Sequence, residues 1–154
     1  MTGRATTGED CVFCVALDHA APESLVVARA ETCFVILNRY PYSNGHVMVV
    51  PNRHIGSLAE ATPDELMELM VLTRRAELAL TEAYQPHGLN LGINMGRPAG
   101  AGVPGHLHMH VVPRWNGDTN FMTVVGQTRV VPEVPPRTLE CLRPIFERLA
   151  REEG

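Results

Sequence analysis

Three of the seven histidines alternate with apolar residues, and this alternation constrains the fold more than any other feature of the sequence. They are His106, His108 and His110. Side chains point alternately to the two faces of a β-strand, so three imidazoles would share one face. Leu107, Met109 and Val111 would then point into a core. Same-face neighbours lie roughly 7 Å apart, which suits contact with one small ligand. A half-exposed strand that merely carries histidines is the alternative, and the pattern favours a histidine site.

Length and composition indicate one globular domain without a nucleic-acid or membrane partner. The chain has 154 residues, 45% hydrophobic and 19% charged, which fits a folded protein with a real core. Its formal charge is −4 and it has no basic run, so a phosphate-neutralising surface for nucleic acid is not expected, although a small anionic ligand is. Residues 1–10 lack an apolar leader, and no apolar run approaches the ~20 residues of a membrane span. A cytoplasmic location is expected.

The order of strand and helix signals predicts an α+β domain over residues 11–154, after a flexible stretch at 1–10. Runs rich in β-branched and aromatic residues predict strands at 25–29, 32–38, 46–51 and 89–95, besides the histidine strand, with a further candidate at 121–125. The first three read as an antiparallel meander. A segment from Pro135 to Arg151 predicts a helix in which Pro144 causes a kink or a late start.

A long helix is predicted at 63–84. Thr62 can cap it, Pro63 suits the first helical position, and Glu65 completes a capping box. Its apolar stripe is expected to face the sheet and to include Leu66, Leu69, Met70, Thr73, Leu80 and Tyr84, with Glu77 as an interruption.

A glycine-rich segment separates the last two strands. Residues 96–105 contain four glycines and two prolines, so regular structure is not expected there. Exposed backbone amides in such a segment suit a bound anion.

The four cysteines divide into a pair and two single residues. Cys11 and Cys14 are spaced as C-x-x-C, which in a cytosolic protein points to metal or redox chemistry before a disulfide. Cys33 and Cys141 lie in apolar runs and are predicted to be small core residues.

Several of these segments together resemble the histidine triad nucleotide-binding superfamily. The glycine-rich loop precedes His-x-His-x-His and the sequence Pro113-Arg114-Trp115, and residues 37–39, 45–51 and 92–100 also match in the family's order. The resemblance covers about residues 11–115. It implies a central antiparallel sheet of about five strands, one long helix, a C-terminal helix and a homodimer, with a C-terminal extension from about residue 116.

The resemblance implies nucleotidyl transfer or hydrolysis at the α-phosphate of an adenosine nucleotide. His108 would be the nucleophile, and a neutral imidazole is chemically suited to attack phosphorus. An acceptor must hold its other nitrogen, which in the family is a carbonyl of the glycine-rich loop. His110 would donate to a phosphate oxygen, while Asn94 and the amides of 100–102 would stabilise negative charge. Histidines and amides supply the donors, so no catalytic metal is required.

Further residues are expected to bind the nucleotide. Asn38 would hold the ribose hydroxyls, with a turn-initiating role as the alternative, and Ile36 and Leu37 would form the base slot. The full expected set is Ile36, Leu37, Asn38, Asn94, Gly100, Ala101, Gly102, His108, His110 and Trp115. Trp115 and Arg114 would contact distal phosphates or a second base, or else form a strand-end salt bridge and core packing. His46 either supports the nucleotide site or closes a hairpin.

The family resemblance also completes a metal site. Zinc-containing members bind the metal with two cysteines and two histidines, which correspond here to Cys11, Cys14, His54 and His106. Such a closed shell makes Zn²⁺ structural and removes His106 from catalysis. The alternative is a reduced cysteine pair beside a solvated His54. His19 and His87 are expected to be exposed.

Within the superfamily, residues 113–122 and 38–42 resemble the bacterial diadenosine tetraphosphate phosphorylases. One departure concerns Gly102, where some phosphorylases have a serine that helps to hold the attacking phosphate. The acceptor can therefore be inorganic phosphate or water. A nucleoside phosphoramidase or a general dinucleoside polyphosphate hydrolase is the alternative activity, and a nucleotide-binding regulatory module is the alternative of another class.

Overall fold

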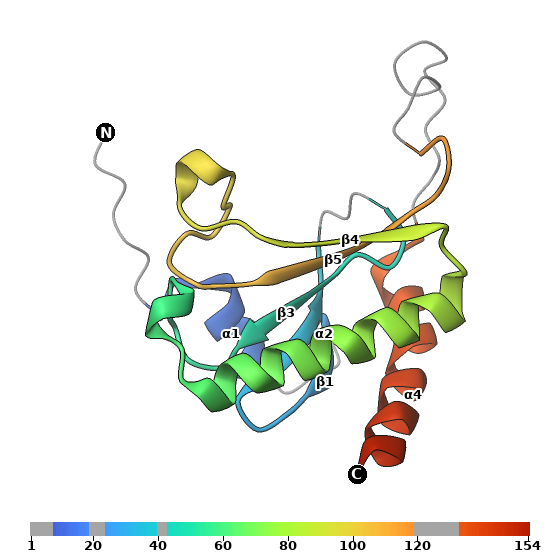
Figure 1. Ribbon diagram of the computed structural model, residues 1–154, viewed down its shortest axis with the longest axis horizontal. Coiled ribbons are helices and arrows are strands. Elements are labelled where there is room, and N and C mark those ends of the chain that lie inside the picture. The colour runs from blue at the N-terminus through green and yellow to red at the C-terminus, as the bar shows by residue number, and fades with distance from the viewer. Residues whose placement is uncertain (1–7, 19–23, 40–42, 119–132) are drawn as a thin grey trace.

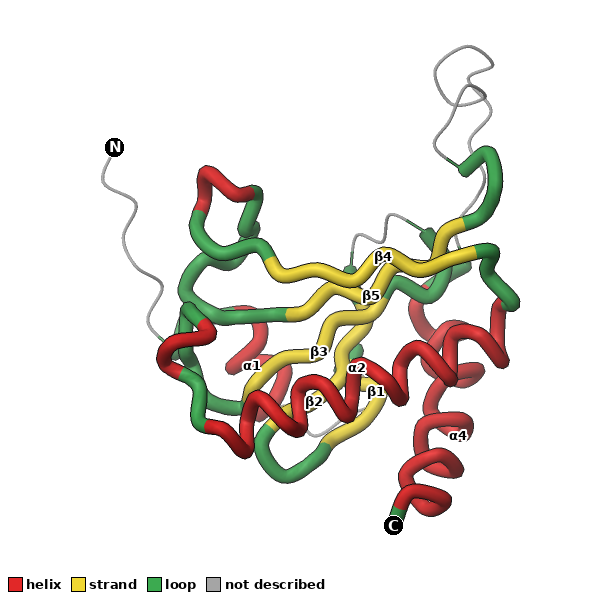
Figure 2. The backbone as a smooth tube through the Cα atoms, in the orientation of Figure 1, coloured by secondary structure: helices red, strands yellow, loops and turns green. Residues whose placement is uncertain are grey.

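A five-stranded antiparallel sheet forms the centre of the molecule (Figures 1 and 2). The computed structural model describes residues 8–18, 24–39, 43–118 and 133–154. The strands are β1 Val26–Arg29, β2 Cys33–Leu37, β3 Val47–Pro51, β4 Gly88–Ile93 and β5 Met109–Arg114. Their order across the sheet is β1-β2-β3-β5-β4, and each neighbouring pair is antiparallel. The predicted meander and α+β class are confirmed.

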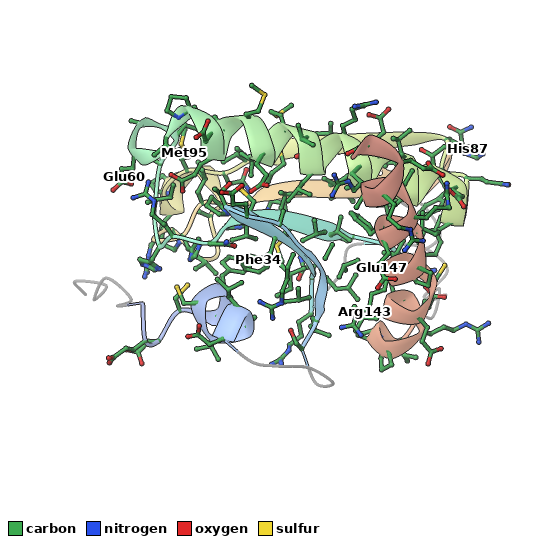
Figure 3. All side chains as sticks on the ribbon, turned by 90° about the horizontal axis from the view of Figure 1, so that it is seen from below. Phe34, Glu60, His87, Met95, Arg143 and Glu147 are labelled. Atoms are coloured by element: carbon green, nitrogen blue, oxygen red, sulfur yellow. The ribbon has the colours of Figure 1, made fainter. Side chains whose placement is uncertain are left out.

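Alternating side chains give the sheet two different faces. Val35 and Val49 pack with the helices α2 (Pro63–Tyr84) and α4 (Pro135–Glu153) in the main core, whereas Phe34 and Val50 belong to a second cluster. The second cluster includes residues of the short helix α1, Val12–Asp18. Figure 3 shows α1 and α2 on opposite sides of the sheet. The α1 face carries the histidines discussed below.

Helix α2 begins and ends where its sequence signals predict. The Thr62 side chain accepts from the backbone N–H of Glu65, and the Glu65 carboxylate accepts from the backbone N–H of Thr62 at 3.1 Å. The prediction for the stripe was partly wrong, because Leu66 and Met70 are exposed. Leu69 and Leu80 are buried as expected, together with Leu72, Ala76 and Ala79. Small alanines allow the helix to approach the sheet on a face shifted from the predicted one.

Helix α4 runs through Pro144 and starts at Pro135, so the late start did not occur. The Cys141 prediction was wrong: this residue is half-buried, because the helix turns Thr138, Leu139, Leu142, Phe146 and Leu149 towards the core instead. Cys33 is fully buried in the main core, as expected. No helix among the described residues is long and apolar enough to cross a bilayer.

Two predictions around the histidines need correction. Strand β5 starts at Met109, not at His106, because the preceding backbone bonds to loops: the N–H of His106 donates to Val103 and that of Leu107 to Ile55. The glycine-rich segment is not wholly irregular, since residues 97–99 form a 3₁₀ turn (η2) between Gly96 and Gly100, both with positive φ. The strand candidate at 121–125, His19 and residues 1–7 of the flexible stretch lie outside the described residues.

Candidate functional site

A cavity of about 1160 Å³ lies on the α1 face of the sheet. Most of the predicted nucleotide-binding residues line it: Leu37, Asn38, Asn94, Gly100, Gly102, His108 and His110. Ile36 and Ala101 are buried and Trp115 is half-buried, and none of these three lines the cavity. The structure therefore gathers residues from β2, β4, β5 and the glycine-rich segment around one space.

Helix α1 forms a wall of this cavity that the sequence analysis missed. Val12, Phe13, Val15 and Ala16 all line the cavity, and Val12 and Val15 are exposed to it and to solvent. Phe13 is buried between two histidine rings, with centroids 5.4 Å from His106 and 5.0 Å from His108. The spacing of Cys11 and Cys14 was the sequence signal for this helix, because residues i and i+3 lie on one face of a helix.

The central histidine is held in one tautomer. His108 is 4% exposed, and its Nδ1 donates to the backbone carbonyl of His106 at 2.8 Å. A carbonyl can only accept, so the proton is on Nδ1 and the lone pair on Nε2. The acceptor belongs to His106 and not to the glycine-rich loop, which corrects the family-based expectation. The backbone before β5 bonds to Val103 and Ile55 and not to a neighbouring strand, and in this arrangement the carbonyl of His106 meets the ring. Burial lowers the pKa of His108, which favours the neutral form.

The third histidine has a buried partner. Nδ1 of His110 lies 3.0 Å from Nε2 of His46, and Nδ1 of His46 lies 3.4 Å from the amide nitrogen of Asn38. Burial, followed by the nearby His110 and His108, lowers the pKa of His46 to about 4. Burial also lowers the pKa of His110. His46 therefore contacts a histidine of the triad in addition to its place in the hairpin. The lowered pKa values keep both His46 and His110 uncharged at neutral pH.

The glycine-rich segment brings its backbone close to Asn94. A Cβ added at Gly100 would lie 3.7 Å from the Asn94 amide nitrogen, whereas one added at Gly102 would meet nothing within 4 Å. Both glycines and Asn94 are exposed and line the cavity. The described charged residues along the cavity are Asp10 and Arg39.

Arg114 is engaged at the end of β5. It forms an ion pair with Asp118 at 2.8 Å and donates to the side-chain oxygen of Asn90 at 2.8 Å. Neither Arg114 nor Trp115 lines the cavity in this chain. This arrangement matches the strand-end salt bridge that the sequence left open for Arg114.

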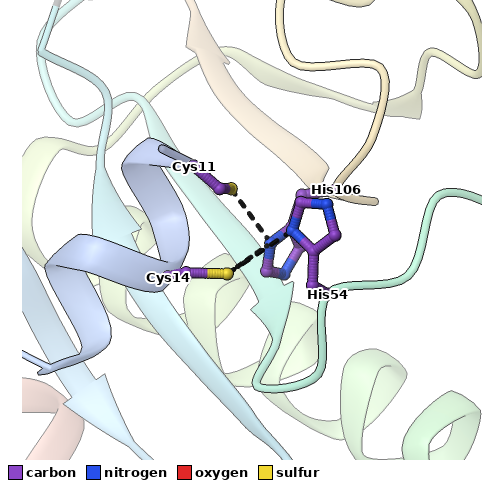
Figure 4. A group of neighbouring side chains, drawn as sticks. All are labelled: Cys11, Cys14, His54 and His106. Carbon is purple, nitrogen blue, oxygen red and sulfur yellow. Dashed lines mark hydrogen bonds between the residues drawn. The ribbon is translucent and has the colours of Figure 1, made fainter. Parts of the chain in front are cut away.

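The four expected metal ligands come together beside the cavity (Figure 4). The ligand atoms of Cys11, Cys14, His54 and His106 all lie within 4.8 Å of one another. Three of the separations are 3.3, 3.4 and 3.6 Å, between Sγ and Nδ1 atoms. A tetrahedron with zinc–ligand bonds of 2.0–2.3 Å has edges of roughly 3.6 Å. The donor set and its spacing therefore fit Zn²⁺.

Protonation within the cluster also suits a metal. Nε2 of His106 donates to the carbonyl of Pro51 at 2.8 Å, which directs the Nδ1 lone pair towards the cysteines. Burial, with a contribution from Cys11, raises the pKa of Cys14 to about 11. Metal binding reverses such a shift because it favours the thiolate. His87 is exposed as expected and lies apart from both groups.

The chain matches the family model described as HIT domain over residues 20–117. AP-4-A phosphorylase of Mycobacterium tuberculosis strain H37Rv is 46% identical over 112 residues. The match covers 73% of this chain and 57% of the relative, so the chain spans little more than half of that protein's length.

Two solved structures have the same fold over nearly the whole chain. A Zn-bound histidine triad family protein from Mycobacterium smegmatis has a TM-score of 0.75 and 29% identity, with 95% of this chain and 99% of that chain covered. A hypothetical histidine triad nucleotide-binding protein from Sulfolobus tokodaii has a TM-score of 0.75 and 30% identity, with coverages of 92% and 95%.

Proposed function

Because the chain belongs to the HIT domain family, we propose that it cleaves dinucleoside polyphosphates through a covalent nucleotidyl-histidine intermediate. Diadenosine tetraphosphate is the expected substrate, by analogy with the AP-4-A phosphorylase relative. The observation that carries the proposal is the tautomer of His108, whose Nδ1 is tied to a backbone carbonyl while the ring lines the cavity. A binding module has no need of such an oriented nucleophile.

In the first step, Nε2 of His108 attacks the α-phosphorus. The bond between that phosphorus and the bridging oxygen breaks, and the remaining polyphosphate leaves with the bond's electron pair; from diadenosine tetraphosphate this product is ATP. His110 donates to a phosphate oxygen, and Asn94 with the backbone amides of Gly100 and Gly102 stabilises the charge. Asn38 and Leu37, which line the cavity, hold the nucleoside.

In the second step, inorganic phosphate or water attacks the same phosphorus, and the bond to His108 breaks. Phosphate gives ADP and water gives AMP. A hydrolase is the second candidate. Gly102 favours it, because a glycine supplies no hydroxyl to hold the incoming phosphate. A nucleoside phosphoramidase would use the same intermediate.

We also propose that Cys11, Cys14, His54 and His106 hold one structural Zn²⁺. A closed shell of four protein ligands leaves no coordination position for water, so the metal would supply cross-linking and not Lewis acidity. It would join α1, the segment after β3 and the segment before β5.

The test is a product analysis with diadenosine tetraphosphate, with and without inorganic phosphate. Phosphate-dependent ADP formation indicates a phosphorylase, and AMP without phosphate indicates a hydrolase. Replacing His108 by alanine is expected to lower kcat by at least about 10³-fold, because nucleophile and intermediate are both lost. The matched control is His87→Ala, an exposed histidine away from the cavity. Unchanged turnover in His108→Ala would refute the covalent intermediate on His108, whereas absence of turnover in the wild type would leave the binding module.

A further inference from the structure

Asn38, His46 and His110 form a hydrogen-bonded chain, here called the relay cluster, that runs from the end of β2 to the cavity. Asn38 follows β2, His46 precedes β3, and His110 lies within β5. The contacts are 3.4 Å from the Asn38 amide nitrogen to Nδ1 of His46, and 3.0 Å from Nε2 of His46 to Nδ1 of His110. His46 is 1% exposed, so water does not compete for its ring nitrogens.

The direction of hydrogen bonding in the relay cluster decides what His110 presents to a ligand. A neutral imidazole has one N–H donor and one acceptor nitrogen. If His46 donates to His110, then Nδ1 of His110 accepts and its proton is on Nε2. If His110 donates to His46, then Nε2 of His110 carries a lone pair. An N–H attracts a phosphate oxygen, and a lone pair repels it.

The contact from Asn38 distinguishes the two directions, because the amide nitrogen is the atom placed 3.4 Å from Nδ1 of His46. An amide nitrogen only donates, so Nδ1 of His46 accepts and its proton is on Nε2, which donates to His110. We propose that Asn38 is a positioning residue that fixes His110 as an Nε2–H donor by acting through His46. This role adds to the ribose contact and rests on the proposed function only for the identity of the phosphate.

The proposal gives two neighbouring imidazoles opposite tautomers. His108 is bonded to a carbonyl, which only accepts, and so carries its proton on Nδ1. His110 is bonded to a donor and carries its proton on Nε2. Their ring centroids are 4.8 Å apart, so a nucleophilic lone pair and a phosphate donor lie side by side. The sequence alone shows two similar histidines, and their buried partners make them chemically different.

The direct test reads the imidazole ¹⁵N shifts of the intact protein by NMR near pH 7.5, with signals assigned by single His→Gln substitutions. We expect His46 and His110 as Nε2–H tautomers. Two histidines serve as internal references. His87 accepts at Nδ1 from the backbone N–H of Asn116 at 2.8 Å and must be Nε2–H, while His108 must be Nδ1–H. A wild-type His46 with its proton on Nδ1 would overturn the proposal.

The isosteric substitution Asn38→Asp replaces a donor by a pure acceptor. We expect Nδ1 of His46 to gain a proton, whether the ring flips its tautomer or becomes cationic. Asn90→Asp is the matched control, because it adds the same charge to the same cavity without contacting His46. Unchanged His46 shifts in Asn38→Asp would overturn the proposal, and this reading requires no turnover.

Kinetics separate positioning from ribose binding. Asn38→Ala removes the donor and lets both directions of the relay cluster occur, so we expect kcat to fall roughly three- to tenfold, the effect of one lost hydrogen bond. A residue that only binds ribose would raise KM and leave kcat unchanged, and that result would overturn the proposal. Absence of turnover in the wild type would instead overturn the proposed function, since the tautomers are measured in the resting protein.

Discussion

Gly102 is the residue at which the choice between phosphate and water can be tested. It lines the cavity, and a Cβ there would meet nothing within 4 Å. We predict that Gly102→Ser folds with a free energy of unfolding within about 0.5 kcal/mol of wild type. The added hydroxyl should raise the share of ADP over AMP at fixed phosphate concentration, measured by chromatography of the products.

The comparison variant for this prediction is Gly100→Ser. Gly100 has φ 93°, so a side chain there is strained and close to Asn94. We expect this variant to lose stability without favouring phosphate. A product ratio that is the same in wild type and Gly102→Ser would mean that the missing hydroxyl does not decide the acceptor.

At the scale of single residues, the sequence predicts which side chains belong to the site better than it predicts their hydrogen-bond partners. The period of two singled out His108, and the C-x-x-C pair with the family resemblance found all four members of the cysteine–histidine cluster. The carbonyl that holds His108 belongs to His106, only two residues away, at a point where the backbone departs from the strand that the alternation predicts. The contact between His46 and His110 joins residues 64 positions apart, so no local pattern encodes it, and His46 remained undecided from the sequence.

The start of α2 supplies a pH-dependent contribution to stability. Hydrogen bonding to Arg53 lowers the pKa of Glu65 from 4.5 to about 2. A carboxylate with a lowered pKa stabilises the fold above its unfolded pKa, and this contribution is lost as the pH falls from 4.5 through about 2. We predict that Glu65→Gln loses about 1 kcal/mol at pH 7, the size typical of a helix cap.

Urea unfolding of wild type and Glu65→Gln as a function of pH checks this prediction. The difference between the two proteins should decrease below pH 4.5 and be lost as the pH falls through about 2. A difference that stays constant over this range would show that charge on Glu65 is not responsible. Glu140→Gln, an exposed carboxyl on α4, is a suitable control.

Helices and strands could be predicted where local sequence signals, such as capping residues and prolines, mark their ends. Helix α2 was predicted from Pro63 to Tyr84 because a capping box and proline mark its start. Helix α1 was missed because seven residues have little helical stability of their own and depend on packing. Strand β5 was predicted to start three residues early, because the histidine alternation continues into residues 106–108, which do not pair with β3.

Metal removal should act on the whole molecule, since the cluster joins three distant segments. We predict one Zn²⁺ per chain, measured by elemental analysis. Chelation should lower the melting temperature and release α1, because the cross-link between Cys11, Cys14 and the histidines is lost. Cys14→Ser should abolish the stoichiometry, while Cys141→Ser, outside the cluster, should retain it. A metal content near zero in the freshly purified protein would refute the site.

The exposed face of α2 is the place to test the homodimer that the family resemblance implies. Met67 and Met70 are 69% and 55% exposed, on the side of the helix away from the core. We propose that this face contributes to a dimer and predict that Met67→Glu with Met70→Glu sediments as a monomer. Ala150→Glu, on the exposed side of α4, should leave the sedimentation coefficient unchanged. A wild type that sediments as a monomer at micromolar concentration would contradict the proposal.

The wall made by α1 has a consequence for engineering. Val12, Val15 and Ala16 line the cavity from α1, a helix of seven residues outside the sheet. This helix carries no part of the relay cluster. This wall of the cavity and the histidines proposed for the phosphate chemistry therefore lie on different pieces of chain. Exchanging the three side chains between Cys11 and Asp18 offers a route to altered base selectivity with the reacting centre left intact.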